Sequence, residues 1–113
     1  MREYHFYVYI MASRSLTLYI GFTSKLQLRV SQHKNGTFEG FSKTYQCHRL
    51  VYYQHFQFAT NGIKREKQLK RWSRAKKIAL IKTMNPAWAD LSEDWGKTIG
   101  PFHEPTISPD ERC

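Results

Sequence analysis

The chain has 113 residues, enough for one domain with a modest core and too few for architectures built from several large domains. Lys and Arg total 18 against 9 Asp and Glu, so the formal net charge of +9 favours polyanionic partners. The hydrophobic content of 41% excludes disorder along the whole chain. The longest apolar stretch, residues 6–12, is far shorter than the roughly 20 residues of a membrane span, so no membrane segment is expected. Two isolated cysteines, Cys47 and Cys113, indicate neither a disulfide framework nor a zinc site and favour a reducing, cytoplasmic setting.

The positive charge is unevenly distributed along the chain. Residues 1–89 hold 16 basic residues and three acids, a net charge of +13, whereas residues 90–113 have a net charge of −4. Three of the four prolines also lie in the last part of the chain. We therefore expect a basic domain over residues 1–97 and a flexible acidic tail over residues 98–113.

Two segments near the start, residues 4–11 and 16–22, are rich in aromatic and β-branched side chains and flank a short polar stretch. This pattern predicts a β-hairpin. Side chains alternate between the two faces of a strand, so the phenol of Tyr9 lies on the face opposite the aliphatic residues, and Tyr19 shares its face with Gly21. The hairpin is predicted to have one apolar face and one face that carries phenols beside a glycine.

A helix is predicted over residues 25–34, with Thr23-Ser24 as its N-cap and Asn35-Gly36 at its end. Positions i, i+3, i+4 and i+7 share one stripe of a helix. Here that stripe consists of Leu26, Arg29, Val30 and His33. Two polar side chains therefore lie on the face expected to pack inward, where a satisfied, partly buried side chain is the ordinary explanation for each one alone.

The remaining elements complete an α/β pattern. Residues 49–56 fit a third strand, residues 59–72 a second helix, and residues 74–82 a third helix that Ser73 caps and Asn85-Pro86 stops. The order β-β-α-β-α-α predicts helices flanking a small, mostly antiparallel sheet. The core is expected to be closed by Trp88, Leu91 and Trp95.

Glu66 is the only acid between residues 40 and 89, and a helical projection places it on the apolar arc of its predicted helix. A salt bridge is the ordinary explanation for a helical Glu, and eight basic residues lie between Lys64 and Lys77. Such a pair does not require the inward position. An inward carboxylate in a basic domain suggests instead a ligand for a hard divalent cation, Mg²⁺ or Mn²⁺.

The basic segment predicts either a solvated helix face or a surface that contacts phosphates without reading sequence. Its candidate nucleic-acid-binding residues are Lys64, Arg65, Lys67, Lys70, Arg71, Arg74, Lys76 and Lys77. Lys25 and Lys34 are candidates on the preceding helix. Trp72 is either a core residue or a base-stacking platform, and its helical spacing favours the core.

A single hypothesis explains the inward Arg29, His33 and Glu66 together with the phenols: a site for phosphoryl transfer. This chemistry needs a group that orients the nucleophile, a cation for the phosphate charge, and a metal or acid at the leaving oxygen. A phenol with an ordinary pKa of about 10 is a poor base at neutral pH. A nearby cation such as Arg29, or a metal, lowers that pKa.

The ordered motifs resemble those of the GIY-YIG nuclease superfamily. Tyr7-Val8-Tyr9 precedes Tyr19-Ile20-Gly21 by ten residues, Arg29 follows Tyr19 by ten, His33 follows four later, and Glu66 lies on a later helix. The stretch REKQLKRWSRAKKIALI followed by NPAWADL is similar to small single-domain members described as predicted endonucleases. The resemblance covers roughly residues 4–95, and the ordered set is more specific than either three-letter motif.

The resemblance implies a compact α/β/α nuclease domain with a three-stranded antiparallel sheet and one divalent metal held by Glu66. It assigns functional tyrosines to Tyr9 and Tyr19, the latter as general base or water-positioning phenol. Arg29 would stabilise charge on the phosphate, and His33 would assist proton transfer or position the base. Which of Tyr19 and His33 takes the proton is left open.

Two positions depart from the family pattern. Tyr7 occupies the place of the first glycine, and a lysine that some branches carry shortly after the second motif is absent, with Phe22 and Thr23 in that region. Lys25 or Lys34 would be the substitutes for this missing cation.

The leading hypothesis is a metal-dependent endonuclease that hydrolyses DNA phosphodiesters by in-line attack of an activated water, in DNA repair, recombination or processing. The alternatives are a non-catalytic nucleic-acid-binding module and a protein-interaction domain whose charge only maintains solubility. Retention of all five polar site candidates favours the enzyme, because a binding module has no need for Glu66 on an apolar arc. A partner protein could supply specificity, and the sequence leaves the preferred DNA structure and the oligomeric state open.

Overall fold

The computed structural model describes residues 4–35, 47–93 and 95. Its elements follow the order β1 (Phe6–Ala12), β2 (Leu18–Thr23), α1 (Leu26–Asn35), β3 (Arg49–Phe56), α3 (Ala59–Arg71) and α4 (Arg74–Met84). The predicted order of strands and helices is confirmed. The acidic tail predicted over residues 98–113 lies outside the described residues, as do Gly36 and Cys113.

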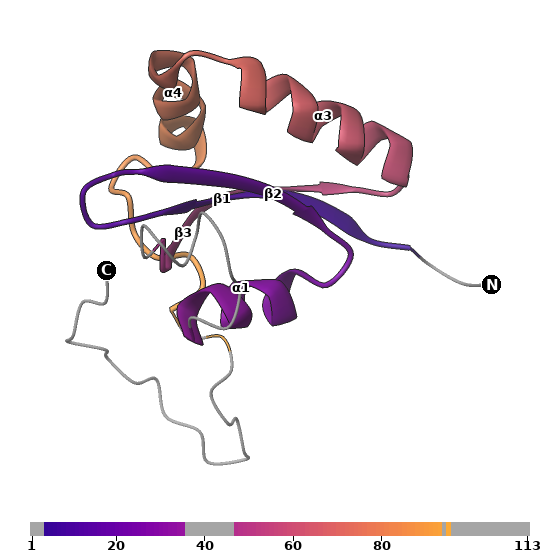
Figure 1. The fold of residues 1–113 in the computed structure, drawn as a ribbon, viewed down its shortest axis with the longest axis horizontal. Coiled ribbons are helices and arrows are strands. Elements are labelled where there is room, and N and C mark those ends of the chain that lie inside the picture. Colours follow the sequence, from indigo (N-terminus) through magenta and orange to yellow (C-terminus); the bar gives the residue numbers. More distant parts are fainter. Residues whose placement is uncertain (1–3, 36–46, 94, 96–113) are drawn as a thin grey trace.

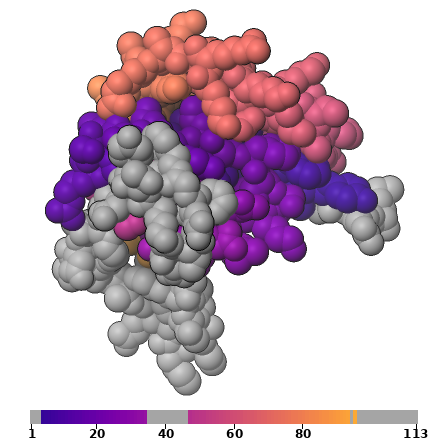
Figure 2. Space-filling model, in the orientation of Figure 1, coloured from indigo at the N-terminus to yellow at the C-terminus, as the bar shows by residue number. Residues whose placement is uncertain are grey.

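The sheet has three strands in the order β2-β1-β3, and both neighbouring pairs are antiparallel. Strand β1 is therefore central and β2 is an edge strand. Helices α3 and α4 cover one face of the sheet and α1 lies against the other (Figure 1). In the space-filling view α3 and α4 form a continuous pink-to-orange layer above the indigo and purple strands (Figure 2). No helix within the described ranges is long and apolar enough to cross a membrane.

Two hydrophobic cores lie on opposite faces of the sheet. The core beneath α3 and α4 contains Val8, Ile10, Ile20, Leu69 and Ile81. The core beneath α1 contains Tyr9, Met11, Leu26, Val30 and Leu50. The predicted alternation along β1 is therefore confirmed, and helices cover both the aliphatic face and the phenol-bearing face.

Strand β2 begins at Leu18, two residues later than predicted, so the hairpin turn is longer on that side. Ser13 N–H donates to the carbonyl of Thr17, and Thr17 N–H donates to Ser13 Oγ, at 2.9 and 3.0 Å. Leu16, which was predicted to begin the second strand, instead has a left-handed φ of 67°. The prediction was wrong here because side-chain contacts from Ser13, rather than the hydrophobicity of Leu16, determine the turn.

The helix limits differ from prediction by one or two residues. Helix α1 begins at Leu26 rather than position 25, because Thr23 stays in β2 and its Oγ1 accepts a hydrogen bond from Lys25 N–H at 2.9 Å. Helix α4 continues to Met84, two residues beyond the predicted end. Its predicted cap is confirmed, since Ser73 Oγ accepts from Lys76 N–H.

A β-bulge in β3 connects the sheet to the segment after α4. Ile10 pairs with Tyr52 and Met11 pairs with Leu50, so Val51 is the extra residue on β3. The buried Asn85 side chain donates from Nδ2 to the Val51 carbonyl at 3.2 Å. Asn85 was predicted only as a helix stop, and its side chain also supplies a hydrogen-bond donor to the strand carbonyl at the bulge.

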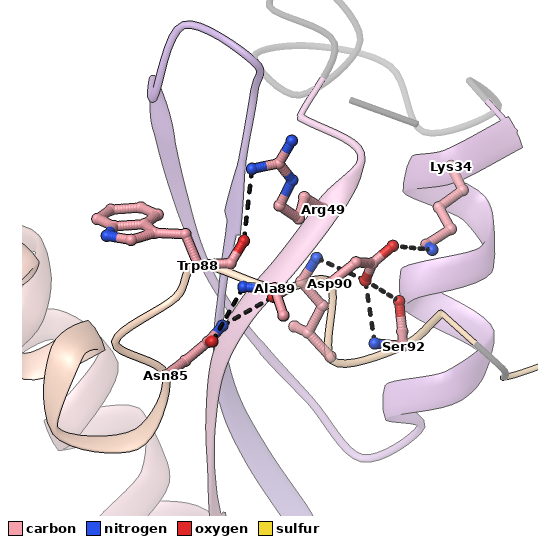
Figure 3. A network of polar contacts seen from close by, with 8 residues as sticks. Lys34, Arg49, Asn85, Trp88, Ala89, Asp90 and Ser92 are labelled. Atoms are coloured by element: carbon pink, nitrogen blue, oxygen red, sulfur yellow. Dashed lines mark hydrogen bonds and ion pairs between the residues drawn. The ribbon is translucent and has the colours of Figure 1, made fainter. Parts of the chain in front are cut away.

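Asp90 connects this segment to α1 (Figure 3). Its Oδ1 accepts from Leu50 N–H at 3.2 Å and from the hydroxyl of Ser92 at 2.7 Å, while Oδ2 pairs with Lys34 Nζ at 2.5 Å. Arg49 donates to the Trp88 carbonyl nearby (Figure 3). The network fixes α1 relative to β3 and so holds the helix that carries Arg29 and His33.

Candidate active site at the edge of the sheet

Gly21 on β2 allows the ring of Tyr9 to lie against the strand. The two residues are cross-strand partners in the antiparallel ladder. A Cβ atom at position 21 would lie 2.4 Å from both Cζ and Oη of Tyr9, closer than packed atoms approach. Glycine is required here by this close approach of the phenol.

The Tyr9 phenol and His33 form a buried pair beneath the site. Tyr9 Oη lies 3.0 Å from His33 Nε2, and each residue is 1% exposed. Burial, aided by Arg29 and His48, lowers the pKa of His33 to about 4, so its imidazole is neutral at pH 7. Burial also raises the pKa of Tyr9 above its ordinary value. Both groups are therefore neutral at pH 7, and both are enclosed by protein.

Tyr19 brings a more accessible phenol to the same place. Its ring centroid lies 4.9 Å from that of His33 and 6.3 Å from that of Tyr9, and the residue is half-buried. Burial raises the pKa of Tyr19, while the positive charges of Lys70 and Arg29 act in the opposite direction. Of the two candidate tyrosines, Tyr19 is the one that an external molecule can reach.

Arg29 and Glu66 complete the predicted set from two different helices. Arg29 on α1 and Glu66 on α3 each influence the ionisation of both Tyr9 and Tyr19. The side chain of Glu66 is 17% exposed, and its Oε2 lies 2.6 Å from Nζ of Lys70, one helical turn further on. The structure thus brings Tyr9, Tyr19 and His33 into contact and places the charges of Arg29 and Glu66 where they act on both phenols. It also contains the salt bridge that was the ordinary explanation for Glu66.

Two hollows flank Gly21 along the β2 edge. One, of about 280 Å³, is lined by Leu18, Tyr19, Ile20, Lys70 and Lys77. The other, of about 370 Å³, is lined by residues that include Phe22, Lys25 and Arg29. A ligand that extends along this edge would meet the Tyr19 phenol with Lys70 and Lys77 on one side of Gly21. On the other side it would meet Lys25 and Arg29.

A metal site at Glu66 fits the residues present only as a site with few protein ligands. No group of three or more His, Cys, Asp or Glu side chains gathers anywhere in the described ranges. Mg²⁺ commonly binds through one or two carboxylates and completes its octahedral shell with water and substrate phosphate oxygens. A single half-buried carboxylate, whose partner Lys70 lines a hollow of about 280 Å³, is consistent with that mode, and a closed structural site is not.

The other predicted cations have several different environments. Lys34, predicted to contact nucleic acid or replace the missing lysine, is held by Asp90. Lys25 lines the second hollow, whereas Lys70 and Lys77 line the hollow that contains Tyr19. Arg74 donates to the Leu16 carbonyl at 2.6 Å. The side chains of Lys64, Lys67, Arg71 and Lys76 are exposed on α3 and α4.

Trp72 packs as a core residue and also carries cations. It contacts the core beneath α3 and α4 and is half-buried, which agrees with the favoured interpretation. The guanidinium of Arg65 lies 5.1 Å from its ring centroid, and the ammonium of Lys76 lies 5.3 Å from it. These cation–π contacts hold two of the predicted basic residues on the outer surface.

The sequence-based search missed the contribution of Asp90, which fixes α1. The signal was present in Asp90-Leu91-Ser92, because an Asp side chain often accepts the N–H two residues on. Here Ser92 N–H donates to Asp90 Oδ1 at 3.0 Å. A salt bridge was considered for Glu66 without naming Lys70 as the partner, although the i,i+4 spacing of the two residues indicates it.

Comparison with known proteins decides the family. The family described as the GIY-YIG catalytic domain matches residues 5–79, a range that contains Tyr9, Tyr19, Arg29, His33 and Glu66. The chain belongs to the GIY-YIG family.

Small proteins of the same family are similar to this GIY-YIG chain over most of their own length. A UPF0213 protein of Syntrophus aciditrophicus is 36% identical over 71% of this chain and 92% of the relative. A UPF0213 protein of Staphylococcus saprophyticus is 33% identical over 66% of this chain and 92% of the relative. Their names assign no reaction.

The fold of this GIY-YIG domain is also similar to a solved structure. The solution NMR structure of the UPF0213 protein from Bacillus halodurans matches with a TM-score of 0.52 at 23% identity, covering 83% of this chain and 99% of that chain. The predicted three-stranded α/β fold is therefore confirmed by both the structure and its neighbour.

Proposed function

We propose that this GIY-YIG protein is a divalent-metal-dependent endonuclease that hydrolyses DNA phosphodiester bonds, with Tyr19, Arg29 and Glu66 as its catalytic residues. The observation that carries the proposal is that the half-buried Tyr19 lines one hollow with Lys70, whose ammonium lies 2.6 Å from Glu66 Oε2. The positive charge of Arg29 also acts to lower the pKa of the Tyr19 phenol. Phosphoryl transfer requires this combination of a nucleophile-orienting group, a cation for the phosphate and a carboxylate.

Tyr19 is assigned the role of general base, which accepts the proton of the attacking water. In hydrolysis the water oxygen bonds to phosphorus, the bond from phosphorus to the leaving sugar oxygen breaks, the water gives its proton to the Tyr19 phenolate, and the leaving oxygen takes a proton from solvent. Arg29 and Lys70 favour the phenolate, because both charges act against the effect of burial on the pKa of Tyr19. His33 is unsuited to accept this proton directly, since it is 1% exposed and its pKa is lowered to about 4.

Arg29 and Glu66 complete the proposed reaction site. The guanidinium of Arg29 would stabilise the negative charge that develops on the phosphate oxygens. Glu66 would hold Mg²⁺ or Mn²⁺, which when bound supplies charge stabilisation at the phosphate and at the leaving oxygen. Tyr9 and His33 would act as positioning residues, because their buried pair supports the ring of Tyr19 from below.

The basic outer surface of α3 and α4 is proposed to bind the DNA backbone. Lys64, Lys67 and Arg71 are exposed on α3, Arg74 and Lys76 are exposed on α4, and Lys77 on α4 is half-buried. Such contacts position DNA without reading its sequence, so any specificity would come from DNA structure or a partner protein. A reducing, cytoplasmic location is part of the proposal and follows from the isolated cysteines in the sequence.

Plasmid cleavage tests this function. Purified protein is incubated with supercoiled plasmid and Mg²⁺ or Mn²⁺ beside Glu66→Gln and Tyr19→Phe. The matched controls are Glu93→Gln and Tyr4→Phe, which make the same chemical changes outside the residue cluster. We expect wild type and controls to nick the plasmid and both site variants to lose at least about a hundredfold in rate. Equal nicking by all five proteins would show a contaminating nuclease.

A non-catalytic DNA-binding module is the second candidate, and one observation favours it. The carboxylate of Glu66 is already paired with Lys70, as in an ordinary structural salt bridge. Salt-sensitive DNA binding by the wild-type protein, without nicking under any metal condition, would support the module and refute the nuclease. The log of the binding constant should then fall linearly with the log of salt concentration.

A further inference from the structure

Lys70 contacts two parts of the candidate site, the carboxylate of Glu66 and the hollow beside Tyr19. Its ammonium lies 2.6 Å from Glu66 Oε2, and its side chain lines the hollow beside Tyr19 and Lys77. The side chain is 55% exposed, whereas that of Glu66 is 17% exposed. The lysine can therefore swing away into solvent or the hollow while the carboxylate stays in place.

The pair between Lys70 and Glu66 is of a kind that breaks easily. Salt bridges between residues four apart on an accessible helix contribute little to stability, because both partners are partly solvated and the lysine loses side-chain entropy. A divalent cation on the same carboxylate would repel an ammonium held at this short distance. The two cations would therefore compete for Glu66.

We propose that Lys70 is the exchangeable counter-ion of Glu66: it neutralises the carboxylate in the metal-free protein and, when a divalent cation takes its place, turns to hold a DNA phosphate in the hollow beside Tyr19. This inference rests on the proposed function. Lys77, which lines the same hollow from α4, would share the phosphate without contacting Glu66. Lys34 is held by Asp90 and Lys25 lines the other hollow, so neither competes for this role.

The exchange makes metal binding and DNA binding depend on each other. While Lys70 is paired with Glu66, its charge is directed at the carboxylate and contributes little to a phosphate in the hollow. Once a divalent cation is bound, the released ammonium is available to the phosphate. Removing Lys70 should therefore strengthen metal binding by the free protein and weaken DNA binding only when metal is present.

Metal binding by the full chain without DNA tests whether Lys70 and a divalent cation compete for Glu66. Mn²⁺ binding is followed by the electron paramagnetic resonance signal of free Mn²⁺ for wild type, Lys70→Met, Lys67→Met, Lys77→Met and Glu66→Gln. Glu66→Gln should abolish the site, and Lys70→Met should tighten Mn²⁺ binding about twofold to fivefold, the strength of a modest salt bridge. Lys67→Met and Lys77→Met remove the same charge nearby without the ion pair and should leave the affinity unchanged.

DNA binding tests whether the released Lys70 then holds a DNA phosphate. Fluorescence anisotropy of a labelled duplex is measured in the Tyr19→Phe background, which prevents cleavage, with either EDTA or Mg²⁺. Lys70→Met should weaken binding about threefold or more with Mg²⁺ and much less with EDTA, whereas Lys77→Met should weaken it under both conditions. Lys70→Arg should restore the Mg²⁺ dependence, which separates exchange from a folding defect.

The outcomes separate this inference from the proposed function. If Mn²⁺ binds through Glu66 and wild type cleaves plasmid, but Lys70→Met leaves the Mn²⁺ affinity unchanged or Lys67→Met changes it equally, the exchange is refuted and the nuclease stands. If Lys70→Met tightens Mn²⁺ binding while no protein cleaves, the exchange stands and the nuclease is refuted. Equal Mn²⁺ binding by wild type and Glu66→Gln would refute both.

Discussion

The phenol oxygen of Tyr9 lies 3.0 Å from Nε2 of His33, and protein encloses both side chains. These two residues belong to the family motif, yet neither is exposed to a substrate. Their contact joins the central strand β1 to helix α1 directly beneath Tyr19. We therefore propose that the pair orients Tyr19, a role that can be separated experimentally from catalysis.

Tyr9→Phe should destabilise the protein and slow cleavage. The substitution keeps the ring but leaves His33 Nε2 buried without its partner, at a cost of about 1–3 kcal/mol. Urea unfolding at pH 7 measures the cost, and Tyr53→Phe, a half-buried tyrosine of the same core, is the matched control. An equal loss of stability in both variants would contradict a special role for the Tyr9 and His33 pair.

Gly21→Ala should be more damaging than Gly62→Ala. At position 21 the added Cβ meets the buried ring of Tyr9 at 2.4 Å, so the ring must move and the contact with His33 is strained. At position 62 the Cβ meets Phe22 Cε1 at 2.5 Å, but that half-buried ring can turn toward the adjoining hollow. We expect overpacking at Gly21 to cost about 1–3 kcal/mol. Thermal unfolding of both variants measures this difference, and an equal or smaller loss at Gly21 would refute it.

The cleavage rate should rise with pH if Tyr19 is the base. Burial raises the pKa of Tyr19, so the phenol is protonated at pH 7, and below its pKa the phenolate fraction grows tenfold per pH unit. Rates with Mg²⁺ between about pH 7 and 9 should follow that slope, and any residual rate of Tyr19→Phe should not. A pH-independent rate in wild type would leave Tyr19 only the role of orienting the water.

Stability should fall as the pH is lowered from 6.5 toward 4. The pKa of His33 is about 4 in the folded protein and 6.5 in the unfolded chain. Between these values the unfolded state therefore binds a proton that the folded state does not. Its contribution, complete above pH 6.5, is lost on acidification and amounts to roughly 2–3 kcal/mol.

Urea unfolding across this pH range measures the loss from His33. His48 has a pKa lowered by burial and by Lys34, so its effect has the same sign. His33→Gln and His48→Gln are therefore compared separately with wild type. A slope unchanged by His33→Gln would contradict the assignment.

Several features of the fold and site could be predicted because they depend on local patterns. The inward stripe of α1 follows from helical spacing, and Leu26, Val30 and His33 are buried as that spacing requires. Arg29 and Glu66 were predicted to serve one site from their inward positions and from the family resemblance, and both affect the ionisation of Tyr9 and Tyr19. They lie on helices that cover opposite faces of the sheet, and spacing along one helix carries no information about how two helices are placed.

Other features depend on tertiary contacts that leave little trace in the sequence. The bulge at Val51 breaks the alternation of β3, and its carbonyl is satisfied by Asn85, which lies 34 residues later. The role of Lys34 was predicted from its charge alone, whereas Asp90 determines its actual partner. Single charges on a basic surface are ambiguous until the fold brings their counter-ions into place.

Asp90→Asn should lower stability by about 1–2 kcal/mol, because Asn keeps an oxygen acceptor for Leu50 N–H but loses the ion pair with Lys34. Asp90→Ala should cost about 2–4 kcal/mol, since it also leaves that backbone N–H without its acceptor. Burial alone would raise the pKa of Asp90, but Lys34 and Ser92 outweigh it and hold the pKa below its ordinary value. The ion pair is thus present at neutral pH, and its contribution to stability declines as the pH falls below 3.8, the ordinary pKa of the carboxyl, toward the lower pKa of the folded protein. Urea unfolding at pH 7 and pH 3 measures both effects, and an equal cost of Asp90→Asn at the two pH values would show that the charge of Asp90 does not stabilise the fold.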